Sequence, residues 1–195
     1  MNAPADVRRL SREYFDALYA GDPDPWGFAS SDYERDKYEH TLAALGQGHF
    51  GRALEVGCSI GVLTRQLAAY CDALMAVDIS EPAVLAARER TDDLEHVSVQ
   101  QRSLPEEMPS GPFDLIVCSE VLYYWDEGLL GTGLDAMTAQ LAPGGRLLAV
   151  HWTEPTRDYP LQGAEVHAVV RAHPGLVPVH GEDRPHYRLD LLARA

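Results

Sequence analysis

The stretch ALEVGCSIGVLT, residues 53–64, decides the fold of this chain. An apolar run ends at Gly57, a second glycine follows at Gly61, and a helical pattern begins directly there. Glycine permits the sharp turn, and the close approach of backbone to a ligand, that such a strand–loop–helix unit needs. The next apolar run ends at Asp78, an acid at the position that accepts hydrogen bonds from a ribose. These features together predict a binding loop for a nucleotide-type cofactor.

The spacing within this loop distinguishes two kinds of cofactor. A dinucleotide fingerprint needs glycine at 57, 59 and 62, so that a pyrophosphate rests on bare amides, but Ser59 and Val62 occupy the last two places. S-adenosylmethionine has no phosphate. Its sulfonium and amino-acid moiety need close backbone approach and an early acid such as Glu55. The loop therefore predicts S-adenosylmethionine as the cofactor.

The charge balance of the chain limits its partners. Sixteen Lys and Arg residues against 30 Asp and Glu residues leave a formal net charge of −14. Such a surface repels a polyphosphate and offers no basic stripe for one, so nucleic acid is not expected as a partner. No closely spaced pair of His or Cys fixes a metal site, and no metal is expected.

Length and apolar patterning predict one cytoplasmic unit. The 195 residues suit a single α/β domain, with residues 1–46 as an N-terminal helical cover and residues 47–195 as the cofactor-binding domain. No uncharged apolar run approaches the ~20 residues that span a bilayer, and the N-terminal sequence lacks the apolar core of a secretory signal. The three cysteines lie in or beside apolar runs and are expected as inert buried thiols.

Apolar runs alternate with helical patterns from residue 53 onward. The predicted strands are 53–57, 73–78, 96–101, 113–119 and 146–152, and the predicted helices are 61–70, 81–90, 127–141 and 162–172. Strands separated by helices form a parallel sheet. Two more extended runs, 176–180 and 187–193, have too short a connection for a crossover helix and predict an antiparallel hairpin. We therefore expect an α/β, Rossmann-like three-layer sandwich with a mostly parallel seven-stranded sheet.

Helix-capping and helix-breaking residues set the limits of the other predicted elements. Two N-terminal helices are expected over 6–20 and about 31–46, the second beginning at a Ser/Asp cap with Glu34 placed as in a capping box. The segment 143–145, Pro-Gly-Gly, predicts a sharp stop for the helix before the fifth strand. Helices at the N-terminus of such a domain can cover a cofactor.

Two strand ends carry the candidate catalytic and substrate-binding residues. The segment CSEVLYYW, 118–125, ends the fourth predicted strand, and His151 and Trp152 end the fifth. Ligands bind beyond the carboxyl ends of parallel strands, so these side chains should converge there. His151 is the candidate general base, because imidazole titrates near neutrality, and Glu120 and Tyr123 are further catalytic candidates. The substrate-binding candidates are Trp26, Tyr124, Trp125, Trp152 and His167, with core packing as the alternative for each aromatic.

From about residue 35 to its end, the chain resembles the class I methyltransferases. Within them it is similar to the nodulation N-methyltransferases of the NodS type, through DPDPWGFASSDYERDKYEHTLAAL, ALEVGCSIGVLTRQLA, LMAVDIS, FDLIVCSEVLYYW and HWTEPTRDYPLQGAEVH. The first and last segments are the more specific ones. The resemblance implies methyl transfer to a small acceptor, with N-methylation of an amino sugar or glycan-derived amine.

The resemblance also extends the set of expected cofactor ligands. Ile79 should contact adenine, and Lys37 could meet the methionine carboxylate, with a solvated helix face as its alternative. Ser103 and the Leu104 amide stand where many such enzymes carry an acid near the adenine amine, so the chain departs from the pattern there. The predicted cofactor-binding residues are Lys37, Glu55, Gly57, Cys58, Gly61, Asp78, Ile79, Ser103, Leu104 and Ser119.

Three other functions fit parts of the sequence. An O-methyltransferase of a small natural product could use the same aromatic strand ends. A non-catalytic S-adenosylmethionine-binding domain would share the fold without the chemistry. Residues 57–61 also match the G-x-S-x-G elbow of α/β-hydrolases, with Asp126 and His180 as nominal partners of Ser59, but no HGGG-type segment precedes the elbow.

Overall fold

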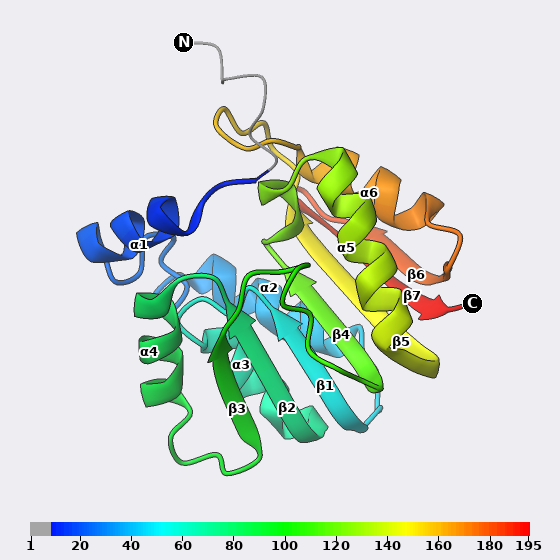
Figure 1. The fold of residues 1–195 in the computed structure, drawn as a ribbon, viewed down its shortest axis with the longest axis horizontal. Coiled ribbons are helices and arrows are strands. Elements are labelled where there is room, and N and C mark those ends of the chain that lie inside the picture. Colours follow the sequence, from blue (N-terminus) through cyan, green and yellow to red (C-terminus); the bar gives the residue numbers. More distant parts are fainter. Residues whose placement is uncertain (1–8) are drawn as a thin grey trace.

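Seven strands form one sheet at the centre of the computed structural model, which describes residues 9–195 (Figure 1). The spatial order is β3-β2-β1-β4-β5-β7-β6. Neighbouring strands from β3 to β5 are parallel, whereas β7 is antiparallel to both β5 and β6. The strands are β1 (Phe50–Val56), β2 (Cys71–Asp78), β3 (Val97–Gln101), β4 (Phe113–Ser119), β5 (Leu141–Trp152), β6 (Leu176–Asp183) and β7 (Tyr187–Arg194). The expected mostly parallel α/β sheet with an antiparallel C-terminal strand is confirmed.

Helices cover both faces of this sheet (Figure 1). They are α1 (Arg12–Gly21), α2 (Asp32–Ala43), α3 (Val62–Leu67), α4 (Glu81–Arg90), α5 (Glu127–Gln140) and α6 (Gly163–Ala172), with short 3-10 helices η1 (Ala68–Tyr70) and η2 (Leu122–Tyr124). Successive residues of a strand point to opposite faces. In β4, Ile116 packs in one core with α5 and α6, whereas Leu115 packs in the other core with α2 and α3.

The strand order reverses beside β1, and this reversal positions the site. β1 pairs with β2 on one side and with β4 on the other, at Val56↔Val77 and Val56↔Cys118. The carboxyl ends of three parallel strands therefore meet at one edge, where Gly57, Asp78 and Ser119 follow or end them. Ligands of open α/β sheets bind at this kind of switch point.

Several predicted boundaries move in the structure. The helix expected over 61–70 is α3 followed by the 3-10 turn η1. The helix expected over 6–20 begins only at Arg12, with Ser11 as its N-cap; residues 6–8 lie outside the described residues. The prediction that Pro-Gly-Gly at 143–145 stops α5 is wrong. α5 ends at Gln140, and the tripeptide lies inside β5, where the pairing with β4 is irregular between Phe113 and Leu115.

β6 and β7 form the predicted antiparallel hairpin at the C-terminus. β6 extends to Asp183, three residues beyond its predicted end, so that only 184–186 remain to connect it to β7. Within residues 9–195, none of the helices combines the length and the apolar character that crossing a bilayer requires.

Candidate functional site

A pocket of about 860 Å³, counting its open mouth, lies at the carboxyl edge of the sheet. The sheet side of its wall comes from the ends of β1, β2 and β4, and the opposite side comes from the N-terminal segment. The predicted site residues on its wall are Trp26, Glu55, Gly57, Cys58, Asp78, Ile79, Leu104, Ser119, Glu120, Tyr124 and Trp125. The topology thus brings most of the predicted set together around one cavity.

The loop after β1 is shaped by two glycines. Gly57 has φ +73°, and a Cβ atom there would lie 2.6 Å from Cγ2 of Val121, in the segment that follows β4. Gly61 has φ +79°, and a Cβ atom there would lie 2.9 Å from Ala87 of α4. Both positions combine a left-handed backbone with a lack of space, which only glycine satisfies. Gly61 itself is not on the pocket wall; it lets α3 begin close against α4.

Ser59 adopts a left-handed backbone without being glycine. Its φ is +49°, and its hydroxyl lies 2.6 Å from the hydroxyl of Tyr19 on α1. Tyr19 is buried and also faces the pocket. A serine at this position therefore ties the loop to the N-terminal helix, which a glycine could not do. Tyr19 was missed in the sequence, where it reads as one apolar residue of an amphipathic helix.

Asp78 ends β2 with its carboxylate held by backbone amides. Oδ2 accepts the N–H of Ser59 and Oδ1 accepts the N–H of Ser80, each at 2.9 Å. Burial raises the pKa of Asp78, and the backbone hydrogen bonds oppose that shift. Each oxygen has further capacity to accept a hydrogen bond, and Asp78 lines the pocket, so the two hydroxyls of a ribose are suitable donors here.

Glu55 places an unsatisfied carboxylate oxygen in the pocket wall. The side chain is 2% exposed, and its Oε2 has no hydrogen-bond partner among the residues that the structure describes. Burial, reinforced by the nearby charge of Asp78, raises the pKa of Glu55 to about 8. A buried acceptor without a donor is costly unless a ligand supplies one. The ammonium group of an amino-acid moiety is such a donor.

Apolar residues after β2 and β3 provide a wall that suits an adenine ring. Ile79 and the buried Leu104 line it, together with Arg102. Ser103, predicted to contact adenine, is not on this wall: its N–H donates to the carboxylate of Glu107 at 2.6 Å. Glu107, four residues later, is not on the pocket wall either.

The N-terminal segment closes the pocket from the side opposite the sheet. Its lining residues between 9 and 28 are Arg9, Leu10, Phe15, Tyr19, Trp26 and Phe28. Trp26 stacks on Phe28 with ring centroids 5.5 Å apart and meets Tyr19 edge-on at 5.7 Å. Trp26, predicted to bind substrate, therefore lies in an aromatic cover over the cofactor loop.

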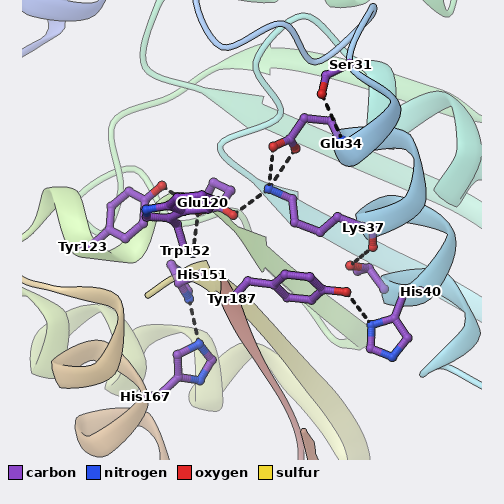
Figure 2. A network of polar contacts seen from close by, with 11 residues as sticks. Ser31, Glu34, Lys37, His40, Glu120, Tyr123, His151, Trp152, His167 and Tyr187 are labelled. Carbon is purple, nitrogen blue, oxygen red and sulfur yellow. Dashed lines mark hydrogen bonds and ion pairs between the residues drawn. The ribbon is translucent and has the colours of Figure 1, made fainter. Parts of the chain in front are cut away.

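Glu120 is the hub of a buried polar network beside the pocket (Figure 2). Its Oε1 accepts Lys37 Nζ at 2.7 Å, and its Oε2 accepts the Tyr123 hydroxyl at 2.6 Å and the Trp152 N–H at 2.9 Å. The side chain is 9% exposed. Glu120 also has φ +55°, which is strained for a residue with a Cβ atom. Strain held in place by such contacts is typical of a functional position.

Lys37 lies between two carboxylates instead of meeting the cofactor pocket directly. Its ammonium is 2.8 Å from Glu34 and 2.7 Å from Glu120, and its side chain is 2% exposed. The expected capping box is only half formed for this reason. Ser31 Oγ accepts the N–H of Glu34 at 3.4 Å, but the carboxylate of Glu34 turns to Lys37 (Figure 2).

His151 does not face the pocket. It is completely buried, its Nε2 accepts the N–H of Leu122 at 3.2 Å, and its Nδ1 lies 3.3 Å from Nε2 of His167. Both ring nitrogens are engaged, so the structure does not present His151 as a base toward an acceptor. Burial, with His167 and Lys37 adding to it, holds the pKa of His151 well below its usual range. His167 is likewise buried and bonds Asp190 at 2.7 Å, away from the pocket wall.

The predicted aromatic residues divide into three groups. Tyr124 and Trp125 line the pocket, and Trp125 also packs so tightly on α5 that a Cβ atom at Gly133 would lie 2.5 Å from its ring. Tyr123 is buried behind Glu120. Trp152 donates its backbone N–H to Glu120, but its half-buried side chain stacks on His186 with centroids 5.4 Å apart and lies outside the pocket wall.

The contacts of Ser59 do not build a hydrolase triad. Its hydroxyl bonds Tyr19, whereas Asp126 accepts the N–H of Leu129 as the cap of α5, and His180 lies 3.7 Å from Glu182 on β6. The cysteines are buried as expected, and burial raises the pKa of Cys71 to about 12. Cys58 also touches the pocket.

The strand order, the reversed C-terminal strand and the glycine loop define the fold of the class I methyltransferases. The family model for nodulation protein S, NodS, matches residues 3–151. The chain therefore belongs to the NodS family, and the predicted family is confirmed.

Relatives and solved structures agree with this assignment. A structure of N-methyltransferase NodS from Bradyrhizobium japonicum WM9 in complex with S-adenosyl-L-homocysteine superimposes with a TM-score of 0.81 at 26% identity, covering 97% of this chain and 99% of that one. A putative methyltransferase from Pseudomonas syringae is 39% identical with a TM-score of 0.74, covering 83% of this chain and 99% of that one. Nodulation protein S of Sinorhizobium fredii is 32% identical over 127 residues, 64% of this chain, and the match spans only 59% of that protein's length.

Proposed function

We propose that this protein is an S-adenosylmethionine-dependent methyltransferase that N-methylates a small amine acceptor, most specifically an amino sugar or glycan-derived amine. One observation carries the proposal: the Glu120 carboxylate, whose side chain is 9% exposed, stands on the wall of the same pocket as the cofactor loop. The complex of a NodS relative with S-adenosyl-L-homocysteine supports the cofactor, and the fact that this relative is an N-methyltransferase supports transfer to nitrogen.

The residues on the pocket wall fit the proposed cofactor part by part. Asp78 would receive the ribose hydroxyls, and the unsatisfied Oε2 of Glu55 would receive the ammonium group. Ile79 and Leu104 would hold the adenine ring between apolar side chains. When bound, this cofactor supplies an electrophilic methyl group on sulfur. The aromatic cover from residues 9–28 excludes water from that cation, which strengthens electrostatic interactions inside.

The charge of the network favours an amine over a hydroxyl. Glu34 and Glu120 share the single ammonium of Lys37, so two carboxylates face one cation in a buried setting. An acceptor that arrives as an ammonium ion is attracted to this wall, whereas a neutral alcohol gains nothing comparable. Glu120 reaches the wall, so it is the group placed to bind the acceptor nitrogen and to take its proton.

The reaction is a direct displacement that needs no covalent enzyme intermediate. An acceptor that binds as an ammonium ion has no free lone pair, so it first gives a proton to Glu120 or to solvent. The freed lone pair of nitrogen then forms a bond to the methyl carbon while the carbon–sulfur bond breaks and S-adenosylhomocysteine leaves. The protein contributes alignment of nitrogen, carbon and sulfur, together with exclusion of water.

Isothermal titration with S-adenosylhomocysteine, on wild type and Asp78→Asn, tests the cofactor. The Asn variant keeps an oxygen acceptor for only one of the Ser59 and Ser80 amides, and it loses the carboxylate charge that strengthens hydrogen bonds from a ribose. We expect one-to-one binding by the wild type and a loss of at least about tenfold in affinity for the variant, equal to about 1.4 kcal/mol. A well-folded wild type that does not bind contradicts the cofactor assignment.

Methyl transfer is then measured with glucosamine as the first acceptor probe and N-acetylglucosamine as its matched control. Mass spectrometry of the product should show a methyl group on nitrogen for glucosamine and no product for the acetylated sugar. Methylation of a hydroxyl group in both sugars would support the O-methyltransferase alternative. Binding of S-adenosylhomocysteine without turnover of any amine or alcohol would support a non-catalytic binding domain.

A further inference from the structure

Four buried groups beside the proposed site form one directed chain of hydrogen bonds. It runs from the N–H of Leu122 to His151, from His151 to His167, and from His167 to Asp190, with distances of 3.2, 3.3 and 2.7 Å. The residues come from η2, β5, α6 and β7, so the chain crosses from the pocket edge to the antiparallel end of the sheet. Figure 2 shows the two rings below Trp152, joined by the hydrogen bond between them.

The position of the proton on each imidazole ring can be assigned by starting from the backbone donor at one end of these hydrogen bonds. The N–H of Leu122 can only donate, so Nε2 of His151 must be a bare acceptor. A neutral imidazole carries one proton, which therefore sits on Nδ1 of His151 and is donated to Nε2 of His167. Nε2 of His167 is then also an acceptor, so the proton of His167 sits on Nδ1 and is donated to Asp190.

Asp190, at the other end of this row of hydrogen bonds, is an ionised carboxylate that accepts the proton of His167. The carboxylate of Asp190, 3% exposed, also accepts two hydrogen bonds from Arg188, at 2.8 and 3.0 Å. Burial opposes ionisation of Asp190, but the hydrogen bonds from His167 and Arg188 outweigh it and lower the pKa of Asp190. A carboxylate kept ionised in this way requires a donor on the ring that faces it.

Close packing of α6 against the end of β5 brings the ring of His167 within hydrogen-bond distance of His151. A Cβ atom at Gly163 would lie 1.9 Å from the carbonyl oxygen of Trp152, so only glycine lets the helix start this close to the end of β5. His167 lies four residues later, on the same face of α6. The glycine therefore sets the contact between the two histidines.

At the Leu122 end, the row of hydrogen bonds anchors the turn that carries the proposed acceptor site. Leu122 follows the strained Glu120 by two residues and begins the 3-10 turn that presents Tyr123 to the Glu120 carboxylate. The amide of Glu120 is bound separately, to the carbonyl oxygen of Val150 at 2.8 Å. Two residues of β5 thus hold this turn: Val150 through its carbonyl oxygen and His151 through its ring nitrogen Nε2. The tautomer of His151 in turn depends on His167.

We propose that His167 and Asp190 are positioning residues of the methyl-transfer site, which hold His151 in the tautomer that anchors Leu122 and thereby place Glu120 and Tyr123. This inference rests on the proposed function for its effect on turnover. The tautomers themselves do not depend on that function, since they follow from the hydrogen bonds alone.

Nitrogen-15 NMR of the wild type, with long-range coupling to the ring protons, reads both tautomers directly. We expect His151 and His167 each protonated at Nδ1 and bare at Nε2. The second measurement compares His167→Gln with His167→Met. The Gln oxygen can still accept from Nδ1 of His151, whereas Met removes the acceptor at similar size. Hydrogen exchange of the Leu122 amide should be near wild type in the Gln variant and at least about tenfold faster in the Met variant.

Turnover of glucosamine should follow the same order, with a loss of about tenfold or more for His167→Met, in kcat and not in S-adenosylhomocysteine affinity. Protonation of His151 at Nε2 in the wild type overturns the proposal, as does a Leu122 amide equally protected in both variants. Equal damage in both variants assigns His167 to packing only and overturns it too. Failure of the wild type to bind S-adenosylhomocysteine counts against the proposed function and leaves the tautomer result standing.

Discussion

The ammonium nitrogen of Lys37 lies 2.7 Å from Oε1 of Glu120, a residue 83 positions later in the chain. This contact joins α2 of the N-terminal segment to the end of β4, so the cover and the sheet share one buried charge network. Lys37 therefore contributes both to the stability of the protein and to the shape of the site, because loss of its charge leaves the carboxylates of Glu34 and Glu120 without a cation.

Replacing Lys37 with Met should destabilise the protein by about 3–5 kcal/mol, since breaking a buried ion pair leaves uncompensated charge. The double variant Lys37→Met with Glu34→Gln removes one of the two stranded carboxylates and should recover part of that loss. Urea unfolding of both variants measures this. A single variant as stable as the wild type, or a double variant less stable than the single one, would show that the charges are not coupled as the distances indicate.

Gly57→Ala should abolish tight binding of S-adenosylhomocysteine, because the added Cβ atom meets Val121 at 2.6 Å and pushes the loop into the pocket. Gly46→Ala is the matched control. Gly46 has a similar φ of +72° but nothing within 4 Å of the added atom, so its substitution carries the backbone cost alone, about 1–2 kcal/mol. Titration should show unchanged affinity for this control variant. Equal affinity in the two variants would disprove the steric explanation.

Glu55 makes the stability of the ligand-free protein depend on pH in an unusual direction. Burial raises its pKa from 4.5 to about 8, so the folded state holds a proton that the unfolded state loses. The stabilising effect is complete below pH 4.5 and disappears as pH rises toward 8. Glu55→Gln has no such dependence, so its free energy of unfolding should exceed that of the wild type by several kcal/mol at pH 8 and match it near pH 4.5. A constant difference across this range would contradict the assignment.

The same carboxyl predicts proton release when the cofactor product binds. An ammonium group beside Glu55 favours the ionised form, so S-adenosylhomocysteine should displace a proton from the wild type at about pH 7. Titrations in buffers of different ionisation enthalpy measure the released proton. Glu55→Gln should release none, and an identical release from both proteins would place the proton elsewhere.

His151 should give the free energy of unfolding a pH dependence opposite to that of Glu55, because its effect is lost at low pH. The pKa of His151 is held well below 6.5 by burial and by His167 and Lys37, and Tyr123 also packs against its ring. The folded state therefore takes up fewer protons than the unfolded state below pH 6.5. The stabilisation from a neutral His151 is present above that pH and is lost as pH falls, at up to about 1.4 kcal/mol per pH unit.

The variant His151→Gln provides the comparison, because its amide oxygen can accept from Leu122 without titrating. Its unfolding free energy should fall less steeply than that of the wild type as pH decreases below 6.5. Parallel curves for the two proteins would mean that His151 is not the group responsible.

Local sequence determined the fold and the cofactor loop of this protein. Glycines with positive φ at 57 and 61, an acid ending the next strand at Asp78, and apolar runs separated by helices act over short stretches of chain. Backbone conformation and residue period dictate such features before any distant contact forms. The strand alternation, the hairpin and the family resemblance could all be predicted for that reason.

Only the tertiary structure decided which side chains meet across the chain. Lys37 pairs with Glu120, and Ser59 with Tyr19, over separations of 83 and 40 residues that no local pattern records. His151 ends a strand at the binding edge, yet its ring turns inward because Leu122 and His167 occupy both of its nitrogens. A strand register places a residue at an edge, but hydrogen-bond competition among buried groups decides where its side chain points, and that competition exists only in the folded chain.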